Sequence, residues 1–150
     1  MARPRRPTNR SADAFVRAVL LGGRWIERLL GAHDPPLTPA QYFALEAASG
    51  REGLVATELA RRLDISAAAV SQVVAGLETA GLVGRGAGGH DRRRRPLELT
   101  AEGRRVFDSA RASMRARLGP LLPHQADALE ELAAKLAGQP PPRRGPPRPP

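Results

Sequence analysis

Residues 88–100 read GGHDRRRRPLELT, so a glycine pair and Asp91 precede four consecutive arginines. A run of like charge repels itself and is ordinarily part of a solvated loop. The flanks of this run indicate more order. Residues 81–85 form a short apolar stretch. Residues 96–99 alternate apolar and polar side chains with the period of a half-buried strand. The pattern predicts a β-hairpin, in which two short strands are joined by a basic loop.

The positive charge of the chain is concentrated in this hairpin and in the two termini. The formal net charge is +9, but residues 1–10 carry four Arg and residues 139–150 carry three, with no acidic residue in either segment. Residues 11–138 hold 17 basic and 15 acidic residues, whereas residues 85–95 hold five Arg against one Asp. Charge at a hairpin tip can meet a polyanion without burial, so the distribution indicates a polyanionic partner bound by one surface.

The length of 150 residues fits one domain with a hydrophobic core. We place that domain at residues 11–138. Residues 1–10 are expected to form a disordered basic tail. Residues 139–150 are rich in Pro and Arg, and we expect them to be disordered as well, because proline removes backbone donors and fixes φ.

Cysteine usage and hydropathy bear on the compartment. The chain has no cysteine, so disulfides and thiolate metal sites are excluded and a reducing cytosol is the natural setting. No apolar run approaches the ~20 residues of a membrane span. Charged residues between Ser11 and Leu30 interrupt any secretory signal. We therefore expect a cytoplasmic protein without membrane contact.

The first half of the chain predicts four helices. Residues 11–30 form an amphipathic pattern that ends at His33-Asp34-Pro35-Pro36, and Thr38 with Pro39 begins a helix that ends before Ser49-Gly50. Leu54–Leu63 is expected to be a short helix. After the turn 64–66, Ser66 is expected to cap a helix from Ala67 to Ala80.

The helix predicted over Ala67–Ala80 has two unlike faces. At 100° per residue, its valines and Leu77 project to one side. Ala68, Gln72, Ala75 and Thr79 project to the other, with Ser71 at the border. A helix surface ordinarily exposes Lys and Glu, so this small and almost uncharged face suggests close approach to a partner. An alanine-rich composition could produce the same pattern.

Two short helices, a tight turn and a basic hairpin occur in the order of a winged helix-turn-helix. Thr100 is expected to cap a helix that runs to about Leu118, and a last helix follows within residues 121–137. The fold class predicted is therefore mainly α with a small two-stranded β wing. The apolar stripes of the first and last helices lie outside the helix-turn-helix and need a partner surface, which predicts dimerisation helices.

The chain resembles the MarR family of transcriptional regulators over residues 12–137. The motifs that carry the resemblance are Leu37-Thr38-Pro39-Ala40-Gln41, Glu58-Leu59-Ala60, Ser66, Leu77-Glu78, Gly81-Leu82-Val83, Asp91-Arg92-Arg93 and Leu97-Glu98-Leu99-Thr100-Ala101-Glu102-Gly103. The wing signature, from Asp91 to Gly103, is the most specific of them.

The resemblance implies a homodimer that binds an inverted-repeat operator in double-stranded DNA. It implies a DNA-binding core at about 38–100, between dimerisation helices at about 11–31 and 101–137. The recognition-helix residues implied are Ser66, Ala68, Ala69, Ser71, Gln72 and Ala75. The wing residues implied are Arg85, Arg92, Arg93, Arg94 and Arg95, with Arg93 in the minor groove and Asp91 bracing the loop.

Some positions depart from the family pattern. Gln72, Ala75 and Gly76 stand where the family commonly has charged residues, and Val55 stands where it usually has a capping Thr. We therefore expect fewer phosphate contacts from the recognition helix and a larger share from the wing and the tails.

Aromatic residues give a candidate effector pocket, since the family often binds small aromatic or anionic molecules. Trp25, Tyr42, Phe43 and Phe107 are the candidates, and a role in the core is the alternative. We expect no metal and no cofactor, because His33, His90 and His124 lack ligand spacing on a helix face. We also expect no enzymatic activity, because no nucleophile motif, P-loop or recognisable carboxylate pair is present.

The sequence thus predicts a dimeric, sequence-specific transcriptional regulator, of the repressor type that a small molecule releases. Two other functions stay open. One is a sequence-tolerant architectural DNA-binding protein in which the wing and the basic tails supply most of the affinity. The other is a domain that binds only protein partners through its helical ends.

Overall fold

The computed structural model describes residues 10–50, 53–86 and 96–137. The elements in chain order are α1 (Arg10–Gly31), α2 (Pro39–Ala48), α3 (Ala56–Leu63), α4 (Ala67–Thr79), β1 (Val83–Arg85), β2 (Leu97–Leu99), α5 (Ala101–Leu118), the 3-10 turn η2 (Gly119–Leu121) and α6 (Ala126–Ala137). The two strands pair antiparallel. The predicted fold class, mainly helical with a two-stranded wing, is confirmed.

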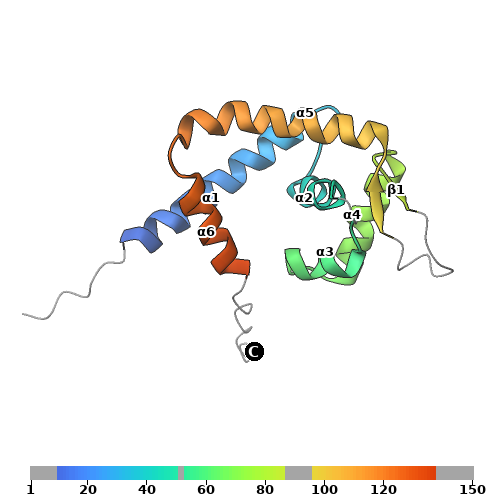
Figure 1. Cartoon of the computed structure of the whole chain (residues 1–150), viewed down its shortest axis with the longest axis horizontal. Helices are drawn as coiled ribbons and strands as arrows, with labels where there is room; N and C mark the ends of the chain where they lie inside the picture. The colour runs from blue at the N-terminus through green and yellow to red at the C-terminus, as the bar shows by residue number, and fades with distance from the viewer. Residues whose placement is uncertain (1–9, 51–52, 87–95, 138–150) are drawn as a thin grey trace, which may run out of the picture.

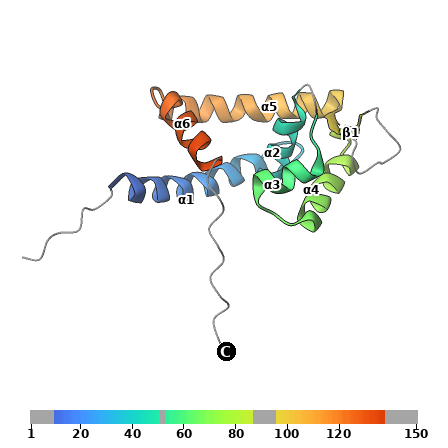
Figure 2. The ribbon, with the colours of Figure 1, turned by 60° about the horizontal axis from the view of Figure 1, so that its bottom comes forward.

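The helices are arranged around α5, which runs the length of the molecule (Figures 1 and 2). The elements α2, α3, α4 and the two strands gather at the N-terminal end of α5. Helix α6 lies at its C-terminal end, and α1 extends from that same end toward α2. The helix-turn-helix is therefore held at one end of the molecule, and the first and last helices lie toward the other.

Three polar side chains set the helix starts that the sequence predicts. Thr38 forms a capping box with Gln41: the backbone N–H of Gln41 donates to Thr38 Oγ1, and that of Thr38 donates to Gln41 Oε1. Ser66 Oγ accepts from the backbone N–H of Ala69 at 3.2 Å. Thr100 Oγ1 accepts from the backbone N–H of Gly103 at 2.9 Å. Each cap satisfies a donor that the first helical turn leaves without a partner.

The predicted start of the third helix is wrong by two residues. Helix α3 begins at Ala56, and Leu54 instead pairs with Leu97 of β2 through two backbone hydrogen bonds of 2.9 and 2.7 Å. Gly53 permits this pairing, because its φ is +67° and a Cβ there would lie 2.8 Å from Leu97 O. Hydrogen bonding to a strand more than forty residues away overrides the local helical pattern.

The corner between β2 and α5 is closed by backbone contact. Thr100 Oγ1 donates to Gly81 O at 2.6 Å, and the backbone N–H of Thr100 donates to Leu82 O at 3.1 Å. Gly103, in the first turn of α5, then lies directly against Leu82, where an added Cβ would be 1.8 Å from Leu82 O. The Leu-Thr-x-x-Gly motif at residues 99–103 is therefore the join between the wing and α5.

The core draws between one and three buried hydrophobic side chains from each of α1, α2, α3, α4, β1, β2 and α5. The largest fully buried side chains are Phe107, Leu30, Leu45, Leu59, Leu77, Leu97 and Val106. They come from α1, α2, α3, α4, β2 and α5. In α1 only Leu30 is buried, although the helix has 22 residues. Most of α1 therefore contributes nothing to the core of one chain.

Gly103→Ala is expected to lower the free energy of unfolding by at least about 2 kcal/mol, because the new Cβ overlaps Leu82 O and the backbone must shift. Chemical denaturation monitored by circular dichroism measures this. Gly119→Ala is the matched control, since nothing described lies within 4 Å of its Cβ position. Equal stabilities for the two variants would show that the corner tolerates a side chain.

Candidate nucleic-acid interface

Helix α4 is held by one face and leaves the other exposed. Val70, Val74 and Leu77 are buried, while Val73 is half-buried. Four small or uncharged side chains on the other side are exposed, namely Ala68, Ser71, Gln72 and Ala75. The structure thus places the outward face of α4 where the 100° rotation predicts it.

Two further residues proposed for this helix have visible local roles. Ser66 is exposed and caps the helix through the N–H of Ala69, which is itself half-buried. Ser71 Oγ donates to Ala67 O at 2.9 Å, so its hydroxyl is bonded within the helix. Gln72 is exposed, and its long amide side chain forms no hydrogen bond with another described residue.

Glu78 is a residue of this surface that the sequence reasoning missed. It is the one charged residue of α4 and lies near the C-terminal end of the helix. Its Oε1 accepts from Arg85 Nε at 2.9 Å, and each side chain is about one-third exposed. Arg85, assigned to the wing, therefore reaches back from β1 to α4. No helical or strand period relates two residues of different elements, so the sequence gives no signal for this pair.

A concave surface runs between α3 and α4 and ends at this ion pair. Its volume is about 550 Å³. The residues that line it are Ala56, Thr57, Ala60, Ala67, Val70, Ser71, Val74, Ala75, Glu78 and Arg85. Small side chains predominate among them, so the backbones of both helices lie close to the surface.

Helix α3, the first helix of the helix-turn-helix, has no side-chain cap at its N-terminus and carries two arginines in its last turn. Val55 occupies its N-cap and makes no side-chain capping bond. Glu58 accepts hydrogen bonds from Arg61 and from Arg62, both at 2.7 Å. These bonds hold the pKa of Glu58 at about 2, so the carboxylate stays ionised and neutralises part of the positive charge of α3.

The tip of the wing lies outside the described residues. This applies to Asp91, Arg92, Arg93, Arg94 and Arg95. The described part of the hairpin continues past the strands to Gly86 and Pro96, where Gly86 N donates to Pro96 O at 2.9 Å. The register pairs Val83 with Leu99 and Arg85 with Leu97.

The four aromatic residues proposed for an effector pocket lie in different surroundings. Phe107 is buried, and its ring lies 5.4 Å from that of Tyr42. Tyr42 lines one hollow and Phe43 lines another. Trp25 is half-buried on α1 and lines neither.

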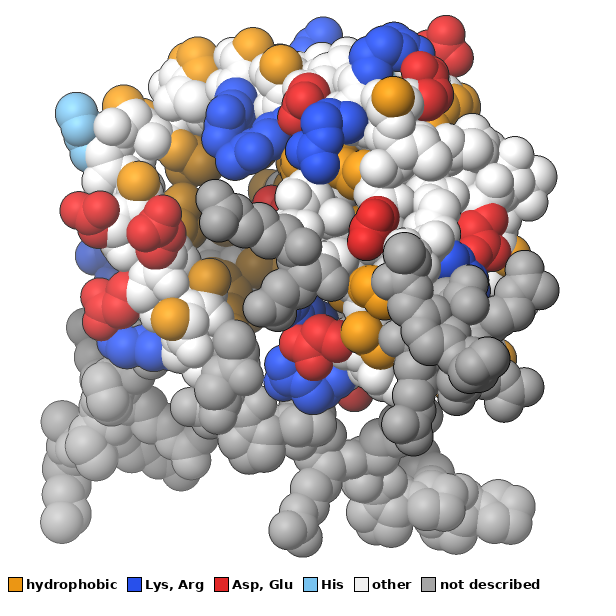
Figure 3. Space-filling model, turned by 45° about the vertical axis from the view of Figure 1, so that its right-hand side comes forward, with side chains coloured by type: hydrophobic (Ala, Val, Ile, Leu, Met, Phe, Trp, Pro, Cys, Tyr) orange, Lys and Arg blue, Asp and Glu red, His pale blue; other side chains and the backbone are white. Residues whose placement is uncertain are grey.

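The hollow beside Tyr42 combines apolar walls with two arginines. It has a volume of about 480 Å³ and is lined by Tyr42, Glu46, Arg111, Met114, Arg115, Leu118, Gly119, Leu122, Ala126 and Leu129. In Figure 3, Lys and Arg side chains gather over α5 beside a hollow in which hydrophobic side chains are visible. Burial and the carboxylate of Glu46 raise the pKa of Tyr42, and Arg111 and Arg115 oppose that rise.

Arg111 and Arg115 were not among the predicted site residues. They lie four residues apart on α5, which is the spacing of neighbours on one helix face. Arg111 also lies over the ring of Phe107, at 5.9 Å from its centre. The spacing is visible in the sequence, but only the structure, which brings residues of α2 and α6 to the same hollow, shows that this face borders one.

A second kind of surface is apolar and lies on the first and last helices. On α1, five large hydrophobic side chains are exposed: Phe15, Val16, Val19, Leu20 and Leu21. Leu121, Leu122, Leu129 and Leu136 are exposed around η2 and α6. Leu21 is 71% exposed and Leu20 is 64% exposed, which is costly for side chains of this size in water.

The described residues also bear on whether the chain has a metal site or a membrane-spanning helix. Among these residues no group of three His, Asp or Glu side chains could hold a metal ion. His33 lies in the loop after α1, where its Nε2 is 3.2 Å from Ser109 Oγ of α5. None of the described helices is both long enough and apolar enough to cross a membrane.

Comparison with known proteins gives a consistent result. A sequence model of the MarR family matches residues 36–94, which span α2, the helix-turn-helix and part of the wing. No curated protein matches the chain. Solved structures do match, and three of them are informative about binding.

The transcriptional repressor CouR bound to a 23-mer DNA duplex is 30% identical, with a TM-score of 0.67 over 83% of this chain and 89% of that one. CouR from Rhodococcus jostii RHA1 bound to p-coumaroyl-CoA is 26% identical, with a TM-score of 0.67 over 87% and 95% of the two chains. The Mycobacterium tuberculosis MarR family protein Rv2887 in complex with salicylic acid is 28% identical, with a TM-score of 0.61 over 89% and 96%.

Proposed function

The chain belongs to the MarR family of winged helix-turn-helix, DNA-binding transcriptional regulators, and from this premise we propose that it is a homodimeric repressor. In this proposal the dimer occupies an inverted-repeat operator, and a small aromatic or anionic effector releases it. The observation that carries the proposal is the exposed face of α4, which is small, almost uncharged and held rigidly by its buried valines.

The face of α4 suits the major groove. Small side chains such as Ala68 and Ala75 let the helix backbone approach the base edges. Gln72 offers an amide that can pair bidentately with adenine. We propose Ser66, Ala68, Ala69, Ser71, Gln72 and Ala75 as the residues of α4 and its cap that lie against DNA.

The wing supplies the positive charge that α4 lacks. We propose that Arg85, Arg92, Arg93, Arg94 and Arg95 face the DNA backbone, with Arg93 in the minor groove and Asp91 bracing the loop. A narrow A/T-rich minor groove concentrates negative potential and attracts arginine. Because Arg85 is held by Glu78, its charge is positioned beside α4 rather than at the tip.

Dimerisation follows from the apolar surfaces of α1 and α6. A second copy of the chain would cover side chains that one copy leaves in water, and closed two-fold symmetry is the commonest arrangement of soluble homo-oligomers. We propose residues 11–31 and 101–137 as the dimerisation helices and residues 38–100 as the DNA-binding core. Two-fold symmetry then demands an inverted repeat with half-sites ~10 bp apart.

The effector site that we propose is the hollow lined by Tyr42, Arg111 and Arg115. Its two arginines can pair with a carboxylate, while Met114 and Leu129 offer apolar contact to a ring. The support from relatives is that CouR binds p-coumaroyl-CoA and Rv2887 binds salicylic acid. The hollow lies between α2 of the DNA-binding core and α5 and α6, so its occupant contacts both parts.

One observation favours a second function. No basic side chain is present on α4, so the helix could lie in the groove without reading bases. The protein would then be a sequence-tolerant architectural DNA-binding protein. A regulator should prefer its operator over random DNA by at least ~10³-fold at physiological salt, whereas an architectural protein should show a small ratio.

Gln72→Ala is expected to weaken operator binding by about 1–3 kcal/mol and to leave binding to random DNA almost unchanged, because the amide acts on a base edge. Arg93→Ala should weaken both and lower the salt slope by about one unit. Fluorescence anisotropy on both DNAs across a salt series measures these effects. If Gln72→Ala weakens operator and random DNA alike, α4 does not read bases.

Replacing Leu20 and Leu21 together by Glu is expected to convert the dimer into a folded monomer, because charge is introduced into the apolar surface of α1 while the core is untouched. Sedimentation velocity at micromolar concentration measures the mass. Arg24→Ala on the same helix is the control and should remain dimeric. An unaltered chain that sediments as a folded monomer would contradict the proposal.

Salicylate is expected to weaken operator binding by the unaltered chain and to have little effect on a variant with Arg111→Gln and Arg115→Gln. Each hydrogen bond to a charged group contributes about 1.5–3 kcal/mol, so the loss should be tenfold or more in salicylate affinity. Arg117→Gln, on the same helix but outside the hollow, is the control. A response to salicylate that survives both substitutions would place the effector elsewhere.

A further inference from the structure

Glu78 places a negative charge on the face of α4 that we propose lies against DNA. It is the only charged residue of α4, and it lines the concave surface between α3 and α4 together with Ser71 and Ala75. An acidic side chain beside the phosphates of DNA lowers the affinity for every sequence, because like charges repel. An acid on such a face therefore needs a role that offsets this repulsion.

The partner of Glu78 is Arg85, which belongs to a different element. Glu78 Oε1 accepts a hydrogen bond from Arg85 Nε at 2.9 Å, and the two side chains are 37% and 31% exposed, respectively. A guanidinium that is held through Nε has a restricted orientation, because Nε is the nitrogen that joins the group to the rest of the side chain. Glu78 therefore holds a positive charge at the edge of the concave surface.

The backbone between the two residues of this ion pair is fixed by other contacts. After α4, Leu82 N donates to Leu77 O at 2.9 Å, and Gly81 takes a φ of +68° that turns the chain into β1. Arg85 then pairs with Leu97 in the register of the wing. The ion pair therefore sets the direction of the arginine side chain rather than the path of the backbone.

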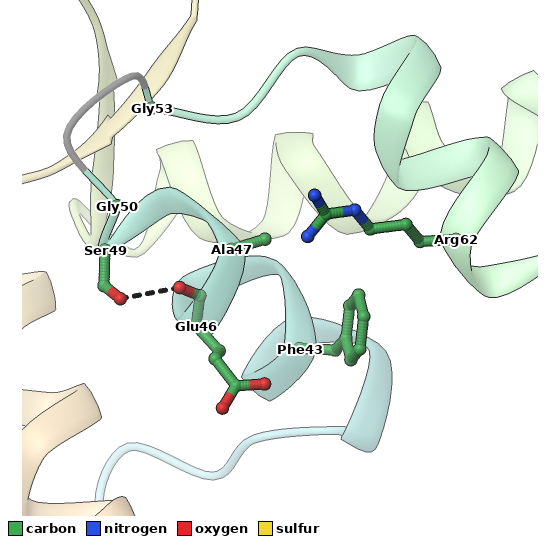
Figure 4. Close-up of a pocket in the computed structure, with 7 residues that line it drawn as sticks. All are labelled: Phe43, Glu46, Ala47, Ser49, Gly50, Gly53 and Arg62. Atoms are coloured by element: carbon green, nitrogen blue, oxygen red, sulfur yellow. Dashed lines mark hydrogen bonds between the residues drawn. The ribbon is translucent and has the colours of Figure 1, made fainter. Parts of the chain in front are cut away.

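The arginines of α3 do not contribute charge to this surface. Arg62 extends from α3 toward α2 and lines the hollow beside Phe43 (Figure 4). Arg61 and Arg62 both donate to Glu58 at 2.7 Å, and neither lines the concave surface between α3 and α4. Among the described residues that do line it, Arg85 is the only basic one. The orientation of Arg85 therefore decides where positive charge lies beside α4.

We propose that Glu78 is a positioning residue for operator recognition, which holds Arg85 against a DNA phosphate beside the C-terminal end of α4. This proposal rests on the proposed function, since it takes α4 as the helix that lies in the major groove. Phosphate contacts fix the register of a protein on DNA, so an arginine that is already held in place favours the site on which α4 docks correctly. Random DNA offers no fixed register, and there the carboxylate only repels phosphate. Glu78 thereby raises the preference for the operator.

Glu78→Asp tests the positioning, because it keeps the charge but shortens the side chain so that Arg85 is no longer held. The operator is the sequence that the full chain retains from a random DNA pool. Two copies of the contact are lost in the proposed dimer, so operator affinity is expected to fall about fivefold or more, while affinity for random DNA stays within about twofold. Fluorescence anisotropy measures both. Glu131→Asp is the matched control, since it shortens the acid that pairs with Lys135 at 2.6 Å on α6.

A double-mutant cycle separates positioning from a structural role. In a chain that carries Arg85→Gln, adding Glu78→Asp should change operator affinity by less than about twofold, because the carboxylate acts through the arginine. A loss of operator affinity that persists in the Arg85→Gln chain would overturn the proposal, since it would show that the substitution perturbs α4 itself. Equal operator affinities for Glu78→Asp and Glu131→Asp would overturn it as well.

Glu78→Gln tests whether this residue lies beside DNA and needs no operator. It is expected to raise affinity for random DNA about threefold and to steepen the salt dependence, because one negative charge is removed beside the phosphates. Glu131→Gln makes the same change in net charge on α6, toward the other end of α5. Salt screens exposed charges over ~8 Å, so this control should change the affinity by less than about twofold. Equal effects of the two variants would place Glu78 away from DNA and overturn the proposal, whether or not the chain reads a sequence.

Discussion

The close contact between Gly103 and Leu82 is the constraint on which the arrangement of the molecule depends. It brings the backbone of α5 directly against the turn that follows α4, and Thr100 secures the corner by donating to Gly81 and capping α5. Helix α5 also carries Val106 and Phe107, which are buried in the same hydrophobic core as Leu59 of α3 and Leu77 of α4. One corner therefore fixes the wing, α4 and the long helix relative to one another. The DNA-binding and dimerisation surfaces that we propose lie toward opposite ends of α5, so their relative position depends on this corner.

The sequence predicts well whatever depends on local chemistry. The caps at Thr38, Ser66 and Thr100, the buried side of α4 and the two strands of the wing each follow from a residue type or a period within a few positions. Features that depend on distant partners could not be predicted. The local pattern places Leu54 in a helix, because its strand partner, Leu97, lies far along the chain and leaves no sign in the neighbouring residues. The pairing of Glu78 with Arg85, and the hollows beside Arg111 and Arg62, arise only when separate elements pack together.

The arginines of the wing and the exposed apolar side chains of the chain belong to different elements. Positive charge is concentrated in the sequence of the wing, while α4 stays nearly neutral, so in the proposed function the electrostatic and the base-reading contributions to DNA binding come from different elements. Exposed leucines and valines are concentrated on α1 and around α6, where a second copy would cover them. Helix α2 lies between these ends, and its residue Glu46 is among those that line two separate hollows, one beside Tyr42 and one beside Phe43. A ligand in the hollow beside Tyr42 would therefore contact α2 of the proposed DNA-binding core together with α5 and α6 of the proposed dimerisation helices.

In the proposed function, the chain recognises a particular DNA sequence as a two-fold symmetric dimer. The most direct measurement is to select DNA from a random pool with the purified full chain at physiological salt, and to sequence what is retained. We predict one enriched motif, an inverted repeat whose half-sites lie ~10 bp apart, because in the proposed dimer each protomer presents one α4 to the major groove. Retention that depends on salt but enriches no motif would contradict the claim and would show that the winged helix-turn-helix binds DNA without reading its sequence.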